Sequence, residues 1–306
     1  MPRIARMIIL DEPAVYHVMS RSALPGNVLG DVEKDYLVKL IQQLSRVYFV
    51  EVLGYAVMGN HFHLCVRMLP GINFNDKEIS QRFKYYYAEM LGQKKREMTA
   101  GQIPSLRLKW SKLSSYLQEI KQRFSHYYNR LHDRHGYFWS DRFKSVIVEE
   151  GNTLINCLAY IDLNAVRAQL VRKPEEYRWC SLGYHIQRGN RKGFLSLDLG
   201  LAEFGQKGNK ARLQLYRDYV YRKGGLDGIF AHSQTGMTNT TELSQIDRFR
   251  YRTRYFIDSG IIGSQTFVKR WYREFCHYFQ SSPKRQPRQI QGLDGIYSLK
   301  RLSEGN

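Results

Sequence analysis

The chain has 306 residues, of which 43% are hydrophobic, so it can bury a core in one large domain or in one domain with an appendage. Its 47 Lys and Arg residues against 28 Asp and Glu give a formal net charge of +19, which predicts a polyanionic partner. No apolar run approaches the ~20 residues that span a bilayer, and Arg3 and Arg6 with Asp11-Glu12-Pro13 argue against a signal peptide. Four scattered cysteines form no C-x-x-C pair, which argues against a zinc knuckle or disulfide scaffold. We therefore expect a cytoplasmic protein that binds nucleic acid.

The first predicted elements alternate between strand and helix. Residues 14–22 alternate in the manner of a strand, and residues 31–46 carry apolar side chains on helical spacing. Residues 47–58 are rich in β-branched and aromatic side chains, and Gly59-Asn60 separates them from the next strand, which predicts a hairpin. Residues 72–104 are polar and loosely helical. An amphipathic helix with a basic outer face is then expected from residue 113 to near Gly136.

A fourth strand is expected over residues 138–149, and Asn152 can cap a helix that runs to about residue 170. The composition changes after an aromatic segment around Trp179, so we place a first domain at 1–186. Residues 187–306 then form a smaller, helical and basic C-terminal extension with a flexible tail.

Two histidines alternate with apolar residues in the strand of the predicted hairpin. Side chains in a strand repeat every two residues, so His61 and His63 project from one face while Phe62 projects from the other. Two adjacent imidazoles are half of a metal site, although a lone H-x-H spacing is weak evidence. In the helix that begins at Asn152, Tyr160 and Asn164 share one face. If that face lies against the histidines, a nucleophilic hydroxyl and an amide ligand reach the same metal.

Segments in this order resemble the single-tyrosine HUH transposases, and among them the REP-associated tyrosine transposases of bacteria, which are related to insertion-sequence 200-like transposases. The segments that carry the resemblance are Tyr16–Arg21, Tyr55–Leu64, Ile120–Arg130, Phe138–Ser145 and Tyr160–Ala168. The resemblance implies an α+β fold, namely a ferredoxin-like HUH domain with an antiparallel sheet and helices on one face.

The same resemblance implies a function and a set of residues. His61, His63 and Asn164 would bind Mg²⁺ or Mn²⁺, and Tyr160 would attack single-stranded or hairpin DNA to form a 5′-phosphotyrosine. Strands could then be rejoined without ATP, as DNA transposition of REP-type elements requires. It further implies a bacterial, nucleoid-associated protein that acts as a monomer or homodimer, with no membrane partner.

Departures from the family pattern concern backbone shape. The family usually has proline where this chain has Gly59, and again where it has Ala165. Residues 72–112 are also longer than the family's usual connection, which leaves the border of the DNA groove open.

Several side chains are candidates for contact with DNA, each against the simpler interpretation that it is solvated or structural. The charged or polar candidates are His17, Arg21, Arg123, Arg130, Arg142 and Lys144. Tyr127 and Tyr128 are alternatives either for stacking on bases or for the nucleophile, and the simpler interpretation of Asn156 is an amide on the helix face.

Two rival functions stay open at this point. One is an HUH nickase of the relaxase or replication-initiator type, which usually has a third histidine that is missing from the motif here. The other is a non-catalytic module that binds single-stranded nucleic acid, in which the histidines are incidental.

Overall fold

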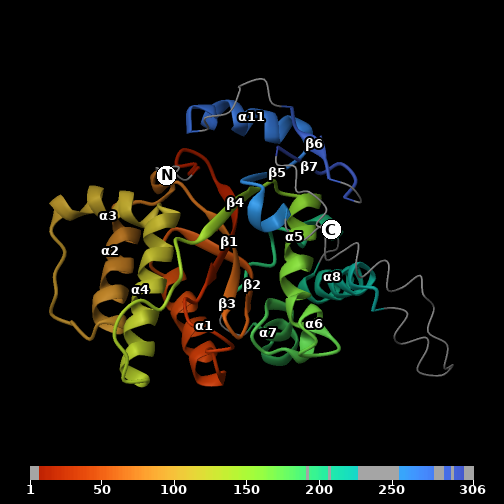
Figure 1. Cartoon of the computed structure of the whole chain (residues 1–306). Coiled ribbons are helices and arrows are strands. Elements are labelled where there is room, and N and C mark those ends of the chain that lie inside the picture. Colours follow the sequence, from red (N-terminus) through yellow and green to blue (C-terminus); the bar gives the residue numbers. More distant parts are fainter. Residues whose placement is uncertain are drawn as a thin grey trace.

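A seven-stranded sheet lies at the centre of the residues that the computed structural model describes, which are 7–190, 193–205, 208–226, 255–278, 286–290 and 293–299 (Figure 1). The strand order is β2-β3-β1-β4-β5-β7-β6. The strands are β1 (Ala14–Arg21), β2 (Val50–Val57), β3 (His61–Met68), β4 (Lys144–Val148), β5 (Ile261–Gly263), β6 (Arg288–Gln289) and β7 (Tyr297–Ser298).

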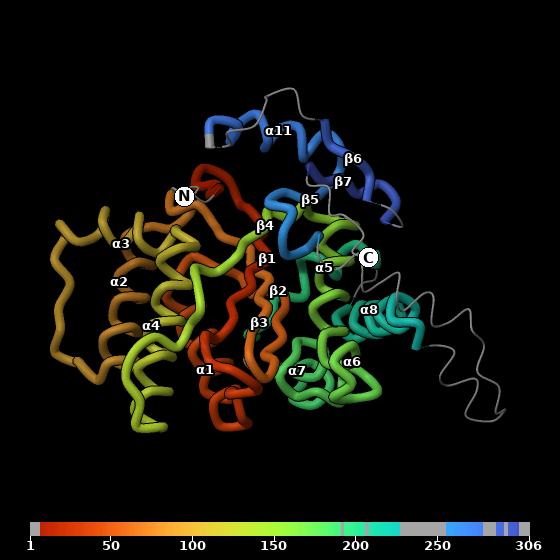
Figure 2. The backbone as a smooth tube through the Cα atoms, in the orientation of Figure 1, coloured from red at the N-terminus to blue at the C-terminus, as the bar shows by residue number. Residues whose placement is uncertain are grey.

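The described helices follow the strands in a mixed α+β order that confirms the predicted fold class (Figure 2). They are α1 (Asp31–Ser45), α2 (Asp76–Lys84), α3 (Ile103–Trp110), α4 (Leu113–Leu131), α5 (Asn152–Asp162), α6 (Asn164–Arg167), α7 (Ser181–Arg188), α8 (Asn209–Gly224) and α11 (Gln265–Phe275). A π-helical turn spans Tyr85–Met90, and short 3₁₀ turns span Gly71–Asn73, Ala100–Gln102, Pro174–Glu176, Ala202–Phe204 and Cys276–Tyr278. Among these helices, none combines the length and the apolarity that a membrane crossing needs.

The central strands confirm the predicted hairpin. β2 and β3 pair antiparallel, and the turn is closed by the Met58 N–H, which donates to the His61 carbonyl at 2.8 Å. β1 pairs with β3 on its other side, in a register that sets Arg21 opposite His61 and Met19 opposite His63. The two histidines therefore lie in the middle of the four-stranded part of the sheet formed by β2, β3, β1 and β4.

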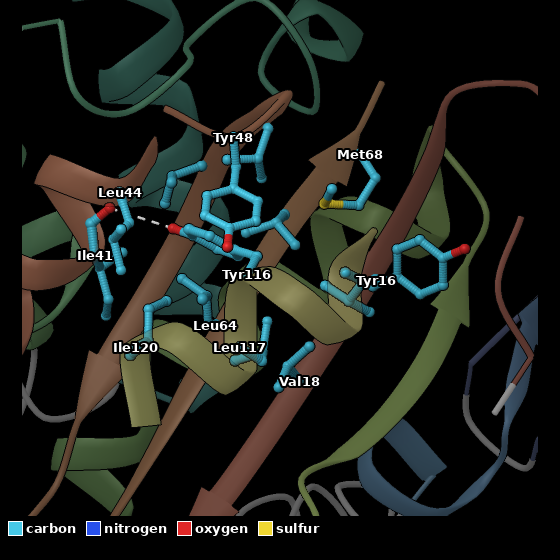
Figure 3. Packing of buried hydrophobic residues seen from close by; sticks show 14 of the residues in the cluster. Tyr16, Val18, Ile41, Leu44, Tyr48, Leu64, Met68, Tyr116, Leu117 and Ile120 are labelled. Atoms are coloured by element: carbon cyan, nitrogen blue, oxygen red, sulfur yellow. Dashed lines mark hydrogen bonds between the residues drawn. The ribbon is translucent and has the colours of Figure 1, made fainter. Parts of the chain in front are cut away.

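One face of the sheet is covered by α1 and α4 (Figure 1). Side chains of β1 and β3 on this face, such as Val18 and Leu64, pack against Leu117 of α4 in an apolar core (Figure 3). The hydroxyl of Tyr116 on α4 donates to the carbonyl of Ile41 on α1 at 3.2 Å, so the two helices are also linked to each other. Burial of large apolar side chains is the main favourable contribution here.

The other face is covered by α5, with α8 packed against α5. The expectation of helices on one face only is therefore wrong. The reason is visible in β1 and β3, where Val15 and Cys65 are as buried as their neighbours Tyr16 and Val66, so both faces of these strands need cover. α5 approaches β2 closely because Gly54 has no side chain: a Cβ there would lie 2.7 Å from Leu158.

Three other expectations are corrected. The fourth strand is β4 alone, since Phe138 and Trp139 leave the strand and pack their rings on Phe124 of α4. The helix expected over residues 152–170 is divided into α5 and α6 at Leu163. The sheet is not antiparallel throughout, because β4 and β5 pair parallel.

Residues after 186 contribute strands as well as helices. The Glu149 N–H of the β4 end donates to the Ile262 carbonyl at 3.0 Å, and β7 and β6 continue the sheet beyond β5. The described part of the C-terminal extension is therefore not purely helical, as was expected, but includes three strands of the sheet. The tail that we expected to be flexible, residues 281–306, lies partly outside the described residues, and its described part includes β6 and β7.

Candidate functional site

Three histidines meet on the α5 face of the sheet. The rings of His17 on β1 and His63 on β3 are stacked, with centroids 5.1 Å apart, and the His61 ring lies edge-on to His63 at the same separation. His17 and His63 are each 1% exposed, whereas His61 is half-buried at the strand end. The strand alternation that was read from the sequence thus places His61 and His63 together, with His17 as a third ring.

Hydrogen bonds fix which nitrogen of each ring carries the proton. His17 Nδ1 lies 2.6 Å from the carbonyl oxygen of Phe256, which can only accept, so Nδ1 carries the hydrogen and Nε2 is an acceptor. His17 Nε2 lies 3.0 Å from His63 Nδ1, which must therefore donate. His61 Nδ1 donates in the same way to Asn60 Oδ1 at 2.7 Å. Both His61 and His63 are left with an unprotonated Nε2.

Burial keeps these rings neutral. It lowers the pKa of His61 to about 4, with Arg21 and Arg167 acting in the same direction. The pKa of His17 is also lowered to about 4 by burial, partly opposed by its bond to Phe256, and burial and the neighbouring histidines bring that of His63 well below its usual range. The Nε2 lone pairs of His61 and His63 are therefore available to bind a metal ion at neutral pH.

α5 brings Tyr160 against the histidines. The Tyr160 ring centroid lies 5.4 Å from that of His63 and 5.7 Å from that of His17, in both cases edge to face. The phenol is 2% exposed, and burial raises its pKa, although Arg167 acts in the opposite direction. Tyr160 is therefore a phenol in this arrangement.

Asn164 and Arg167 complete the helical face that begins at Tyr160. Asn164 Nδ2 donates to the Tyr160 carbonyl at 3.1 Å, while Asn164 Oδ1 accepts from Arg167 Nη2 at 2.7 Å. The Arg167 guanidinium also lies 4.3 Å from the centre of the Tyr160 ring. Sequence reasoning missed Arg167, although its position three residues after Asn164 and seven after Tyr160 places it on the same helical face.

A buried carboxylate anchors the end of α5 that carries the tyrosine. Asp162 accepts hydrogen bonds from Ser181 Oγ at 2.7 Å, from the Leu182 N–H at 2.9 Å and from Tyr216 Oη at 2.6 Å. These partners belong to α7 and α8, so the position of Tyr160 depends on both helices. This residue was also missed, because its partners lie 19 to 54 residues later in the chain.

Residues 255–258 cover the site. The Phe256 ring stacks on Tyr160 with centroids 5.3 Å apart and an interplanar angle of 20°. Two residues later, Asp258 accepts from Lys144 Nζ at 2.7 Å, which ties this segment to β4. This segment therefore contributes both to the burial of Tyr160 and to the bonding of His17.

The predicted DNA contacts divide between the two faces of the sheet. Arg21 and Lys144 lie on the histidine face, since Arg21 is opposite His61 and Lys144 is in register with Met19. Arg142 belongs to a loop that joins the β1 end through the Ser140 N–H, which donates to the Arg21 carbonyl at 3.0 Å. Their contact with DNA stays a prediction.

The prediction that His17 contacts DNA is wrong, because both of its ring nitrogens are bonded inside the core and the side chain is buried. Arg123 and Arg130 lie on α4, which covers the opposite face, so they do not border the histidines. Tyr127 and Tyr128 are on the same helix and are therefore not alternative nucleophiles for this site. Asn156 is an amide of the helix face, and its Nδ2 donates to the Asn152 carbonyl at 2.8 Å.

The donor set fits a divalent ion in part. Within the described residues, no group of three or more His, Cys, Asp or Glu side chains could hold a metal. Two imidazole Nε2 atoms are nonetheless aligned by hydrogen bonds at the opposite ring nitrogen, as in metal-binding histidines generally. The third expected ligand, Asn164 Oδ1, is bonded to Arg167. A metal would need that amide to be released.

Comparison with solved structures finds a structural likeness to a DNA-bound protein. No family model and no curated protein matches the chain. A solved structure of a REP-associated tyrosine transposase bound to a REP hairpin is similar over 65% of this chain and 90% of that one, with 16% sequence identity and a TM-score of 0.42. A likeness at this level assigns no residue role and no activity to the chain.

Proposed function

We propose that this protein cleaves and rejoins single-stranded DNA, with Tyr160 as the nucleophile. The observation that carries the proposal is the position of Tyr160, whose ring centroid lies 5.4 Å from that of His63, a histidine with an unprotonated Nε2. The Arg167 guanidinium lies over the same phenol ring. Buried titratable side chains with shifted pKa values, gathered in one place, are typical of functional sites.

The reaction follows from the chemistry of these side chains. The Tyr160 oxygen attacks the scissile phosphorus and loses its proton, the bond to the 3′ oxygen breaks, and that oxygen takes up a proton. The products are a 5′-phosphotyrosine and a free 3′-hydroxyl, and attack by another 3′-hydroxyl reverses the step. Arg167 favours the charged phenolate. A Mg²⁺ or Mn²⁺ ion at Nε2 of His61 and His63, with Asn164 as third ligand, would polarise the phosphate.

The substrate class rests on charge and on the sequence resemblance. The net charge of +19 favours a polyanion, and Arg21, Arg142 and Lys144 are exposed beside the histidine end of the sheet. The resemblance to REP-associated transposases makes hairpin DNA of REP type, and transposition in the bacterial nucleoid, the finer form of the proposal.

The test is a covalent adduct. The protein is incubated with Mn²⁺ and hairpin DNA labelled at its 3′ end, because a 5′-phosphotyrosine retains the 3′ fragment, and the mixture is resolved under denaturing conditions. We expect an adduct with the wild type and none with Tyr160→Phe. Tyr137→Phe is the matched control, since Tyr137 is 91% exposed and lies outside the site. An adduct with Tyr160→Phe would remove the proposed nucleophile.

The rival functions make different predictions. A relaxase would use three histidine ligands, but the third ring here, His17, has both nitrogens bonded to Phe256 and His63. A pure binding module would hold hairpin DNA without forming any adduct with the wild type. That result, over many hairpin sequences, would favour the binding module.

A further inference from the structure

A groove rich in tyrosine and cationic side chains lies on the opposite side of the sheet from the histidines. It encloses about 740 Å³ between α1, α4 and the turn Tyr85–Met90, a volume typical of ligand sites. The side chains that define it are Tyr36, Tyr86, Lys109, Arg123, Tyr127 and Arg130. We call it the tyrosine groove. None of these residues takes part in the histidine site.

Aromatic surface is already arranged for stacking. The rings of Tyr36 on α1 and Tyr127 on α4 are parallel within 13°, with centroids only 3.6 Å apart, and both are half-exposed. A stacked pair at a groove wall can be continued by a nucleobase, because every base has a π face. The Tyr86 ring adds a third aromatic surface, 5.4 Å from the Arg123 guanidinium.

A buried carboxylate makes one wall rigid. Glu119 is 11% exposed and accepts from Tyr48 Oη at 2.7 Å, Tyr86 Oη at 2.6 Å and Arg123 Nε at 2.9 Å. Glu119 also pairs with Lys109, whose Nζ lies 3.6 Å from Glu119 Oε2. The lining therefore carries three cations, Lys109, Arg123 and Arg130, against this one carboxylate. The excess of positive charge suits a polyanion.

The position of the tyrosine groove in the chain is also informative. Tyr86 and Lys109 come from residues 72–112, the connection between the hairpin and α4. The two other walls come from helices whose inner faces belong to the apolar core. Residues 72–112 therefore supply one wall of the groove, and α1 and α4 supply the others.

We propose that the tyrosine groove is a second nucleic-acid site, which binds unpaired nucleotides by stacking bases on its tyrosines and by neutralising phosphates with Arg123 and Arg130. The proposal rests on the proposed function only in taking DNA as the polyanion. The sheet separates this site from Tyr160, so one strand can be held at one face while another is cleaved at the other.

Binding is measured without any chemistry. The full chain is titrated in EDTA against a dye-labelled thymine homopolymer, longer than the roughly 4–16 nucleotides that one binding module covers, and fluorescence anisotropy gives the affinity. We expect Tyr127→Leu to weaken binding roughly fivefold or more, because one stacking contact is lost. Arg130→Ala should also weaken it, and should reduce the slope of log affinity against log salt by about 0.7.

Matched controls separate the groove from the rest of this basic surface. Tyr137→Leu removes an exposed tyrosine and Lys77→Ala removes an exposed charge on α2, each outside the groove. Both should bind as the wild type does. Equal losses in the controls, or no loss in Tyr127→Leu and Arg130→Ala, would overturn the proposal. So would an acidic peptide that binds as tightly as the oligonucleotide, since charge alone would then explain the groove.

The same variants distinguish the two proposals. Tyr127→Leu should still form the covalent adduct at saturating hairpin DNA, because it does not touch the histidine site. If the wild type forms no adduct but the anisotropy losses appear as stated, the proposed cleavage fails and the tyrosine groove stands. If the adduct forms and the losses are absent, the reverse holds.

Discussion

The two faces of one sheet are built by opposite rules. On the face covered by α1 and α4, the strands present side chains such as Val18 and Leu64, and the core holds mainly apolar and aromatic groups. On the face covered by α5, the same strands present His17 and His63, and the helix presents Tyr160 beside them. Alternation in two strands is enough to separate a packing face from a chemical face.

The two faces differ in how strictly they specify their side chains. The apolar face is specified mainly by volume and shape, since dispersion and the hydrophobic effect have no preferred direction. The histidine face is specified more strictly, because each buried polar group there needs a particular partner at a particular atom. We therefore expect substitutions on the first face to change stability alone, and substitutions on the second to change stability and chemistry together.

The largest expected loss of stability is on the apolar face. Phe124→Ala removes a fully buried ring that packs on Phe138 and Trp139, and should lower the free energy of unfolding by about 3–5 kcal/mol. Urea denaturation measures the change. The rate of adduct formation per folded molecule should be that of the wild type. A fall in that rate beyond the loss of folded protein would show that the two faces are coupled.

A smaller stability loss with a chemical effect is expected at Asp162. Asp162→Ala leaves the donors of Ser181, Leu182 and Tyr216 without their buried acceptor, which should cost about 3 kcal/mol. Because these bonds hold the end of α5, the adduct rate per folded molecule should also fall, roughly tenfold or more for a misplaced nucleophile. Phe124→Ala is the control of comparable instability. An unchanged rate in Asp162→Ala would reduce this carboxylate to a structural role.

A change in metal affinity is expected at His17. His17→Phe keeps a ring in the core but leaves His63 Nδ1 without its acceptor, so the affinity for Mn²⁺ should fall about 10–100-fold. The adduct yield is measured against Mn²⁺ concentration, with circular dichroism to confirm folding. Excess Mn²⁺ should restore the yield, as expected for a residue that orients a ligand. A loss that no Mn²⁺ concentration restores would argue against that role.

The smallest expected effect is on the pH dependence of stability. His185 of α7 is buried, and burial lowers its pKa to about 4, so the native state binds fewer protons than the unfolded state between pH 4 and 6.5. Stability should therefore fall as the pH decreases through this range, by about 1 kcal/mol per such histidine between pH 6.5 and 5.5. His185→Gln should remove that share. A denaturation series whose pH slope is the same in both proteins would contradict the assignment.

The sequence predicts the fold class and the local periods well, because alternation and helical spacing are local properties. The hairpin before His61 is confirmed, and the helix expected from residue 113 to near Gly136 is present as Leu113–Leu131, ending about five residues earlier than expected. The sequence predicts poorly those features that depend on contacts between residues far apart in the chain. Cover on both sheet faces depends on α5 and α8, and the strand β5 reaches β4 from more than a hundred residues away.

The candidate site divides in the same way. Spacing predicts that His61 and His63 share a strand face and that Tyr160 and Asn164 share a helix face, whereas the contact between the two faces depends on how α5 packs on the sheet. Phe256 could not be predicted, because nothing local ties a residue 239 positions away to His17. The outer face of α4 was read as a continuation of the DNA groove, since a basic helix pattern does not say on which side of a sheet it lies.

The bond between His17 and Phe256 has a consequence for biosynthesis. A ribosome makes β1, β3 and α5 long before it makes residue 256, so the early chain can fold its sheet while His17 has no carbonyl to fix its proton. The hydrogen bonds from His17 to Phe256 and from His63 to His17 leave His63 Nε2 unprotonated only after Phe256 has been synthesised. The order of translation thus places completion of the histidine pair after most of the chain has left the ribosome.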